Sequence, residues 1–373
     1  MPLFEVLGKN ANFPWPLMGF IDVHGNVVIE PQFLQISRGF SGQFSEAGYA
    51  FVKRSHGKQN LIINTSGETV LVLPGDHQPI AQTPPDEHGI FGVTHEVGAN
   101  NKELWHVEGR DREFQGETRY YAMRLDGSIA FEAHLLDAAI GHYVFLKDGN
   151  LNGPRGLINH KGQIIIPPIY DAIYLSKTGP YATVLKDGFA NVFTFEGSAV
   201  FRDPVEIGSS ADLRSVENGL WVAPTRAKGC ASVFDVASTE AIGTLPMTYW
   251  SPMIREACPT LSGGVALINH PEKGSTYFFP DGRAAMPGIQ RKPRWFESEM
   301  RTGYFHEGRA SFKLGEVWGY MDLSGKYVIE PQFSSDLPFR DGLARVKYPS
   351  DGNSWNRYSY VNCEGSVVWH QED

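Results

Sequence analysis

The sequence has few of the features that most often reveal a protein's chemistry. It contains only three cysteines, Cys230, Cys258 and Cys363, an odd number that includes no Cys-x-x-Cys pair. Such a set fits neither a disulfide framework nor a zinc site, so we expect reduced thiols in a cytoplasmic protein. No apolar run approaches the roughly 20 residues that cross a bilayer, and the first residues lack a signal-peptide pattern. We therefore expect no membrane association.

Positive charge and catalytic motifs are also scarce. Lys and Arg number 33 against 42 Asp and Glu, which leaves a net charge of −9. An acidic chain is a poor candidate for binding phosphate backbones, so we expect no nucleic-acid partner. The sequence contains no phosphate-binding P-loop and no His-x-x-x-His or His-Glu-x-x-His pattern. We predict no catalytic, metal-binding or cofactor-binding residues, and hence a protein that is not an enzyme.

Glycine and proline, in contrast, are abundant, with 40 and 24 residues, and this favours many turns and short strands. The phrase "GNVVIEPQF" at 25–33 returns as "GKYVIEPQF" at 325–333. Between them, short polar turns recur and each ends on a small residue. These markers are Gly25, Gly67, Gly127, Gly162, Gly197, a degenerate Ser238, Gly282, Gly325 and Gly365. Their spacing averages about 42 residues, the period of a stacked or radial β-repeat.

Apolar, strand-like runs flank each marker, so each marker predicts a β-hairpin. An Asp or Asn often stands three residues before the marker, as at Asp22, Asn64, Asn159, Asp322 and Asn362. Its side chain can accept hydrogen bonds from the turn backbone, while Gly at the marker can take a positive φ. We therefore interpret these acids and amides as turn caps rather than catalytic groups.

A further strand that begins Gly-x-Ala precedes most hairpins, as in "GRASFK" at 308–313 and "GLARVK" at 342–347. Phe305 and Phe339 stand just before these strands, and we expect them to fill the space between neighbouring units. Prolines are expected to end the second strand of the hairpin, at Pro31, Pro74, Pro167 and Pro331. A single unit would expose two sheet edges and an apolar face, so several units must associate.

The unit "FHEGRASFKLGEVWGYMDLSGKYVIEPQF" at 305–333 resembles the bacterial WG-repeat family, named for the Trp-Gly pair that opens the hairpin. Trp318-Gly319 supplies that pair, and Met18-Gly19 and Arg155-Gly156 stand at equivalent positions. Only one of the nine hairpins keeps the tryptophan. The resemblance implies a β-repeat module that is used in binding, and it brings no catalytic residues.

These patterns predict an all-β protein with eight to nine antiparallel repeats of about 42 residues in one domain, 1–373. The best-kept units are 18–54, 155–188 and 305–348. Closure into a propeller-like ring would hide sheet edges, so we expect a closed or nearly closed array. The alternative is an open β-superhelix.

The repeat is least regular where a binding surface is expected. The step from Gly67 to Gly127 is about 60 residues, so 73–121 holds either an insertion or a decayed repeat. Insertions into repeats often carry binding loops, and Trp and Arg are frequent in interface hot spots. The candidate partner-binding residues are Trp105, Arg110, Arg112, Trp250, Arg255, Arg294 and Trp295. Their alternative role is to fill gaps between units.

We therefore expect a non-catalytic scaffold that binds another protein, in an immunity or adaptor role. The alternative is a propeller that binds a carbohydrate or small ligand, including a glycan-active enzyme. A central funnel with two or more carboxylates and an aromatic platform would favour that alternative, and a funnel of small aliphatic residues would disfavour it.

The turn assignment is testable at Gly325. If this residue takes a positive φ, Gly325→Val should destabilise the protein by about 1–3 kcal/mol through backbone strain. A thermal or urea melt measures the change. An unaltered melting curve would contradict the hairpin turn at this position.

Overall fold

The computed structural model of the chain is built from β-strands joined by turns. Its described part contains no helix with the length and apolar character needed to cross a membrane. The structure describes residues 2–9, 16–34, 43–55, 59–75, 77–80, 83–97, 117–146, 153–207, 213–224, 229–249, 256–270, 274–286, 303–314, 316–335, 337–349 and 357–371.

The strands of the described residues fall into nine consecutive units. Unit 1 contains β1 (Phe4–Gly8), β2 (Leu17–Ile21) and β3 (Val27–Leu34), and unit 2 contains β4 (Tyr49–Arg54), β5 (Asn60–Asn64) and β6 (Thr69–Val72). Unit 3 contains β7 (His77–Pro79), β8 (Ile90–Val97), β9 (Glu117–Arg124) and β10 (Ile129–Glu132), and unit 4 contains β11 (His134–Ala139), β12 (His142–Leu146), β13 (Arg155–Asn159) and β14 (Ile164–Tyr170). Unit 5 contains β15 (Ala172–Leu175), β16 (Tyr181–Lys186), β17 (Phe189–Thr194) and β18 (Val205–Glu206), and unit 6 contains β19 (Leu220–Pro224), β20 (Cys230–Asp235) and β21 (Ala241–Pro246). Unit 7 contains β22 (Thr248–Tyr249), β23 (Glu256–Ala257), β24 (Leu261–Ser262), β25 (Val265–His270) and β26 (Gly274–Phe278). Unit 8 contains β27 (Arg309–Leu314), β28 (Val317–Asp322) and β29 (Tyr327–Phe333), and unit 9 contains β30 (Leu343–Val346), β31 (Ser359–Asn362) and β32 (Val367–His370).

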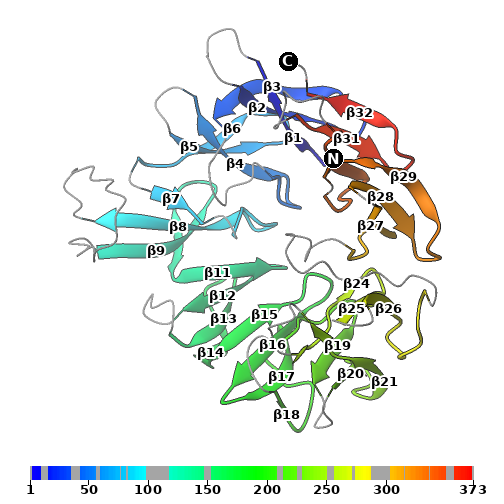
Figure 1. Ribbon diagram of the computed structural model, residues 1–373. Coiled ribbons are helices and arrows are strands. Elements are labelled where there is room, and N and C mark those ends of the chain that lie inside the picture. The colour runs from blue at the N-terminus through cyan, green and yellow to red at the C-terminus, as the bar shows by residue number, and fades with distance from the viewer. Residues whose placement is uncertain are drawn as a thin grey trace, which may run out of the picture.

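Each unit contains three consecutive antiparallel strands that pair in order, here called its first, second and third strands. Units 1 and 2 join into one six-stranded sheet because β3 pairs with β4, and unit 7 also contains the separate pair β22 and β23. In unit 8, for example, β27, β28 and β29 pair in that order. The first strands lie toward the middle of the molecule and the third strands toward its circumference (Figure 1). Units 3, 4, 5 and 7 add a further inner strand beside the first, namely β7, β11, β15 and β24. The first strands of these four units are β8, β12, β16 and β25, each paired with its inner strand.

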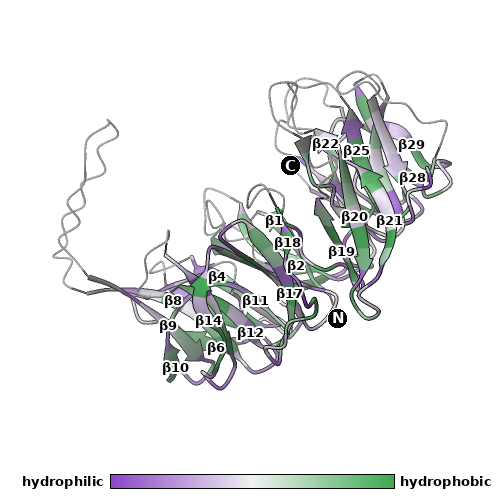
Figure 2. Cartoon of the chain, turned by 90° about the horizontal axis from the view of Figure 1, so that it is seen from below, coloured by the Kyte–Doolittle hydropathy of each residue, from purple (hydrophilic) through white to green (hydrophobic). Residues whose placement is uncertain are grey.

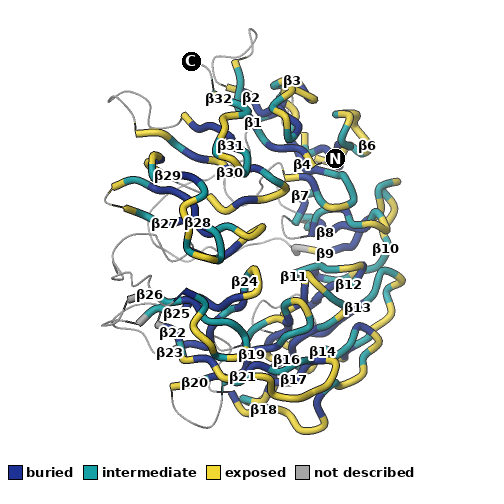
Figure 3. Tube along the Cα trace, turned by 90° about the vertical axis from the view of Figure 1, so that its right-hand side faces the viewer, coloured by how far each residue is buried: buried dark blue, intermediate teal, exposed yellow. Residues whose placement is uncertain are grey.

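The units form a ring because each one buries an apolar face against each of its two neighbours. Nine clusters of buried apolar residues are found in the described chain, and each cluster joins one pair of adjacent units. Between units 1 and 2, for instance, Phe20 and Ile29 pack with Ala50 and Leu61. Buried segments run through the middle of the strands, and exposed ones lie at the turns and the circumference (Figure 3). Apolar colour likewise concentrates in the strands (Figure 2).

The ninth of these interfaces closes the ring between the two ends of the chain. Phe4 and Val6 of unit 1 pack with Leu343 and Tyr360 of unit 9. The rings of Phe4 and Tyr360 lie 5.5 Å apart, and the Tyr360 hydroxyl donates to the Glu5 carbonyl oxygen at 2.9 Å. The array is therefore closed by side-chain packing between separate sheets, as a propeller is, and the open superhelix is not the arrangement found.

The closing interface also repeats the geometry of the others. In several units the glycine that ends the hairpin turn rests on the third strand of the preceding unit, as Gly67 does on Ile29 and Gly365 on Ile329. Gly25 of unit 1 rests in the same way on Val368 of unit 9, whose carbonyl oxygen occupies the space a Cβ would need. Unit 9 thus precedes unit 1 in space as unit 1 precedes unit 2.

The hairpin turns confirm the expected turn caps. Asp322 accepts backbone N–H groups from Ser324 and Lys326 through Oδ1, and the same i+2 and i+4 pattern occurs at Asp22, Asn64, Asn159 and Asn362. Gly325 has φ +81°, as predicted. In unit 6 the marker differs from the expectation. The turn there is one residue longer, since Asp235 N–H bonds Glu240, and Thr239 rather than Ser238 takes the positive φ.

The glycine of the Trp-Gly pair is required by a close contact between two backbone segments, which the sequence alone did not show. A Cβ added to Gly319 would lie 2.6 Å from the carbonyl oxygen of Ile329 on the third strand, and one on Gly19 would lie 2.6 Å from that of Ile29. At both glycines the pairing between second and third strands shifts register. Glycine is required because the third strand crosses directly over this residue.

Proline has a different place from the one expected. Pro31, Pro167 and Pro331 lie inside β3, β14 and β29, which continue beyond them, and only Pro74 follows its strand. The prediction that these residues end the strand was wrong for the first three. The nitrogens of Pro31 and Pro331 face the glycine crossing, where the ladder is interrupted, so the missing N–H costs no hydrogen bond.

The aromatic residues before the first strands occupy the gaps between units, as expected. Phe339 meets Tyr320 edge-on with 4.9 Å between ring centroids, and Phe305 meets Tyr277 in the same way at 5.1 Å. Phe44 and Phe20 repeat this contact at 5.0 Å. In each pair the first residue belongs to one unit and the second to the preceding unit. Such edge-to-face pairs stabilise beyond their buried area.

The glycine crossing predicts a specific sensitivity. Gly319→Ala should lower the free energy of unfolding by about 2–3 kcal/mol, because the new methyl group has to displace backbone atoms. Gly75→Ala is the matched control, since a Cβ there meets nothing within 4 Å. Urea denaturation of both variants measures the difference, and equal stabilities would contradict the close approach.

Ring closure predicts a loss of stability at high pH. Burial is the largest cause that raises the pKa of Tyr360, to about 12, and burial also raises that of Tyr358. A raised tyrosine pKa means that the fold favours the neutral phenol. Its stabilisation is full below pH 10 and is lost as the pH rises from 10 through about 12, for Tyr360 by on the order of 2–3 kcal/mol.

The double variant Tyr358→Phe/Tyr360→Phe should therefore lose less stability between pH 10 and 12 than the unmodified protein. Tyr174→Phe, at a side chain on the surface, is the control and should follow the unmodified protein. Unfolding by urea at several pH values measures the slopes. If the double variant and the control lost stability with pH at the same rate, alkaline unfolding would not originate at the closing interface.

Candidate functional site

The ring has two unlike faces because every unit repeats the same strand directions. We call the face where first strands begin and second strands end the turn face, and the opposite one, where first strands connect to second strands, the loop face. Within a unit, the turn before the first strand bonds the hairpin turn, as Leu125 N–H does with Gly89 O and His160 N–H with Gly141 O. Both kinds of turn therefore share the turn face.

The turns that precede the first strands form an inner rim that ties the units together. Almost every contact between successive rim segments includes a polar bond to a backbone group or a charged side chain. The bonds are Ser45 Oγ to Pro85 O (2.6 Å), Tyr143 Oη to Asp86, Lys177 Nζ to Asp137 (2.9 Å), Asn218 N to Thr178 Oγ1 (2.7 Å), Arg214 Nη2 to Cys258 O, Ser262 Oγ to Phe305 O (2.6 Å) and Gly342 N to Glu307 (2.9 Å). They run in order from unit 2 to unit 9.

Arg340 of unit 9 completes the rim by reaching unit 2. Its guanidinium donates to the Gln43 side-chain oxygen at 2.5 Å and to the Phe44 carbonyl oxygen at 3.4 Å. Residues almost 300 positions apart in sequence are thus joined at the middle of the ring.

A cavity of about 360 Å³ lies inside this rim, a volume within the range of small-ligand sites. It is lined by residues 43–47 of unit 2, 84–87 of unit 3 and 138–141 of unit 4, with Phe51, Lys177 and Arg340. A more open hollow between units 2 and 3 shares Ala47, Asp86 and Glu87 with it. The two hollows therefore adjoin at these residues.

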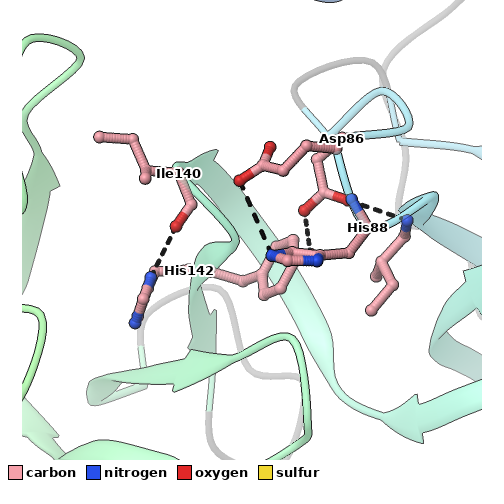
Figure 4. A network of polar contacts seen from close by, with 7 residues as sticks. Asp86, His88, Ile140 and His142 are labelled. Carbon is pink, nitrogen blue, oxygen red and sulfur yellow. Dashed lines mark hydrogen bonds and ion pairs between the residues drawn. The ribbon is translucent and has the colours of Figure 1, made fainter. Parts of the chain in front are cut away.

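Most charged groups in this cavity already have partners. Lys177 is held by Asp137 and by the Ala138 carbonyl oxygen, and Arg340 is held as described. Asp86 accepts N–H groups from His88 and Ile90 at 2.9 and 3.0 Å, and it also accepts the Tyr143 hydroxyl (Figure 4). Burial is the main cause that raises the pKa of Tyr143, and the Asp86 charge raises it further. These groups therefore serve to fix the rim.

Histidines gather beside the same network. The rings of His88 and His160 stack with their centroids 3.8 Å apart across the boundary of units 3 and 4. His142 bonds the Ile140 carbonyl oxygen through Nδ1 and stacks on Phe195 (Figure 4). Burial lowers the pKa of His160, and the nearby His88 lowers it further, so this ring favours its neutral form. The stack is a packing contact between units.

The cavity can bind a polar group but offers little for catalysis. Glu46 and Glu87 remain exposed at its edge, whereas Asp86 is saturated by its three donors. The aromatic residues in its lining, Phe44 and Phe51, are only 7% and 5% exposed, so neither presents an open ring for stacking. In the described residues, no group of three or more His, Cys, Asp or Glu is placed to hold a metal ion.

The residues predicted from sequence to bind a partner are not those that form the rim. Trp105, Arg110, Arg112, Trp250, Arg255, Arg294 and Trp295 all lie outside the described residues. The structure therefore neither brings them together nor separates them. Sequence reasoning missed the rim itself, although a signal existed, since a polar or acidic residue precedes several of the marked Gly-x-Ala starts, as at Glu307 and Asp341.

The long step between Gly67 and Gly127 is accounted for by unit 3. It contains β7 and the strands β8 and β9. The pairing of β8 with β9 begins where Ile90 faces Arg124 and ends where Val97 faces Glu117. The residues between Val97 and Glu117 connect these two strands and lie outside the described part of the chain. The extra length thus falls within one unit, at the loop face.

Comparison with known proteins finds three segments that match one repeat family. The family model described as "WG containing repeat" matches residues 18–55, 156–188 and 318–348, which lie in units 1–2, 4–5 and 8–9. No curated protein matches the chain. Three of the solved structures that match share little sequence with it.

BamB from Moraxella catarrhalis is 10% identical, with a TM-score of 0.43, over 91% of this chain and 98% of that one. The C-terminal WD40 domain of Sif2 is 12% identical, with a TM-score of 0.38, over 75% and 77%. A eukaryotic initiation factor is 11% identical, with a TM-score of 0.49, over 100% and 96%. Three segments of the chain, in units 1–2, 4–5 and 8–9, therefore match the WG-containing repeat.

The rim predicts that single polar contacts affect the stability of the ring. Tyr143→Phe should cost about 1–2 kcal/mol of unfolding free energy, because it removes a donor from the Asp86 carboxylate in a buried setting. Tyr327→Phe, at an exposed position, should be nearly neutral. Thermal denaturation of the two variants compares them, and a neutral Tyr143→Phe would show that this contact does not fix the rim.

Proposed function

We propose that this WG-repeat ring is a non-catalytic scaffold that binds another protein through its loop face. The observation that supports this best is that the two faces of the ring differ in their polar contacts. The polar groups of the inner rim are engaged in joining the units. The described residues of the loop-face connections are not part of that network.

Unit 3 is the part of the loop face best suited to reach a partner. Its strands β8 and β9 pair across eight positions, whereas β27 and β28 of unit 8 pair across six. The two additional residue pairs lengthen this hairpin, and a rigid base positions a binding segment. Trp105, Arg110 and Arg112 lie in that connection, and they provide an aromatic anchor with guanidinium groups that bind carboxylates.

An adaptor or immunity role in the cytoplasm suits such a scaffold. A ring whose units are joined on all sides presents its loops without a large change of shape. Rigid presentation lowers the entropic cost of association. This part of the proposal rests on analogy with other repeat scaffolds rather than on a particular contact.

A small-ligand site in the central cavity is the second candidate. Glu46, Asp86 and Glu87 supply the carboxylates that such a site was expected to contain. The open aromatic platform that a sugar would stack on is missing from the described lining, since Phe44 and Phe51 are buried between units. The protein-binding scaffold therefore has the stronger support.

The scaffold proposal is tested by replacing residues 100–116 with a short Gly-Ser linker. The fold should survive, because the length of a connection changes stability only slowly and β8 and β9 stay paired. Proteins that co-purify with the unmodified chain from its native lysate should be depleted with the variant. Quantitative mass spectrometry of both pull-downs measures the depletion.

Two results would contradict the proposal in different ways. A melting temperature lowered by many degrees would mean that the segment is part of the ring core. A normal melt with an unchanged set of co-purifying proteins would remove unit 3 from the binding surface. The control for both measurements is Lys161→Ala, a single change on the turn face.

A further inference from the structure

Positive charge on this acidic chain gathers at one arc of the loop face. In units 8 and 9 the ends of the first strands and their connections carry Lys313, Arg345, Lys347 and Arg357. In units 1 and 2 the same places carry Lys9, Lys53 and Arg54. Among the described residues at these places, Glu316 is the one carboxylate, and it lies 3.9 Å from Lys313 Nζ. We call these seven residues the cationic arc.

Unit 5 shows no such gathering of positive charge, since the tight turn between β16 and β17 carries Lys186 and Asp187, one charge of each sign. The cationic arc therefore spans four consecutive units, 8, 9, 1 and 2.

The turn face has the opposite sign. Carboxylates occupy its hairpin turns, as at Asp22, Asp126, Asp281 and Asp322, and also its rim turns, as at Glu307. The net charge of −9 is thus spread unevenly. At physiological salt a charge acts over about 8 Å, so a partner at the loop face experiences the arc rather than the whole molecule.

The arc exists only because the ring is closed. Lys313, Lys347 and Arg357 belong to the last two units, and Lys9 and Arg54 belong to the first two. The packing of Phe4 and Tyr360 brings these two halves side by side. A partner that contacts both halves binds the closed ring better than an opened one, and it therefore stabilises closure.

We propose that the cationic arc docks an acidic polypeptide surface that bridges units 8–9 and units 1–2. This inference rests on the proposed protein-binding function and names the chemistry of the partner. Complementary charge sets orientation and association rate at such interfaces. An extended nucleic acid fits less well, because a duplex longer than the arc would meet the rest of a chain whose net charge is −9.

The test uses a fluorescent peptide of about twelve glutamates as the probe, because a run of carboxylates is the simplest form of this chemistry. Its binding to the full chain is measured by anisotropy at low and physiological salt. Arg54→Glu and Arg357→Glu reverse one exposed charge in each half of the arc, and the double variant reverses both. Lys161→Glu/Lys326→Glu makes the same change in net charge on the turn face and is the matched control.

Each single arc variant should weaken peptide binding several-fold, and the double variant about tenfold or more, whereas the control pair should stay within about twofold. Bound peptide should also raise the melting temperature of the unmodified chain but not of the double variant. Equal weakening by arc and control pairs, no binding at low salt, or tighter binding of a DNA duplex of similar charge would each overturn the proposal. Loss of fold in a variant is recognised by its melt, and Lys9→Glu then replaces the affected change.

The outcome is independent of the scaffold test. Peptide binding at the arc with unaltered pull-downs after loss of 100–116 would retain the arc and remove unit 3 as the contact. Depleted pull-downs with no peptide binding would retain the scaffold and remove the acidic partner.

Discussion

The structure depends on the burial of two apolar faces by every unit. A three-stranded antiparallel sheet has two faces and two edges, and alone it leaves both faces in water. Here one face of each unit packs on the preceding unit and the other on the following unit, so no unit can be the last in an open row without exposing apolar surface. The cluster between units 9 and 1 removes that exposure. Closure is thus a consequence of the same burial that joins neighbours elsewhere.

The Trp-Gly pair gains a physical meaning from this arrangement. Its glycine allows the third strand to cross the second at Gly19 and Gly319, and the register shift there bends the sheet. The tryptophan is one of several residues that fill the adjoining interface, which explains why Met18 can replace Trp318. Both are buried against the next unit. The backbone constraint is strict, whereas the side-chain requirement is for apolar volume.

Much of the fold could be predicted because turn chemistry repeats in sequence. A turn-ending Gly identified eight of the nine hairpins, and Asp or Asn three residues earlier supplied the expected cap at five of them. The caps and positive φ values at these five followed from those residues alone. The turn of unit 6 was misplaced by one residue because Thr239 adopts a conformation usually reserved for glycine. Proline was predicted at strand ends because its missing N–H normally removes a hydrogen bond from the sheet. At Pro31 no hydrogen bond is lost, because the strands cross there, and a local sequence pattern does not show that crossing.

The candidate site was harder to predict for a related reason. The inner rim is made of contacts such as Arg340 with Gln43, which join distant parts of the sequence and require no recognisable motif. The charge of the loop face likewise depends on which chain ends meet. Sequence patterns identify units, and the surface shared between units appears only when the ring is assembled. The Trp and Arg candidates were chosen from irregular segments by residue type. Residue type carries no information about which segments become neighbours in the ring.

The equivalence of all nine interfaces has a consequence for chain connectivity. Gly25 sits on Val368 as Gly67 sits on Ile29, so the ring has no position that is special except where the chain begins and ends. The two termini are held in adjacent units, and a short linker could join them. A circular permutant opened between units 5 and 6 would then bury the same nine clusters in the same order. The ring is, in this sense, a closed series of units, and the fold does not depend on which unit comes first in the chain.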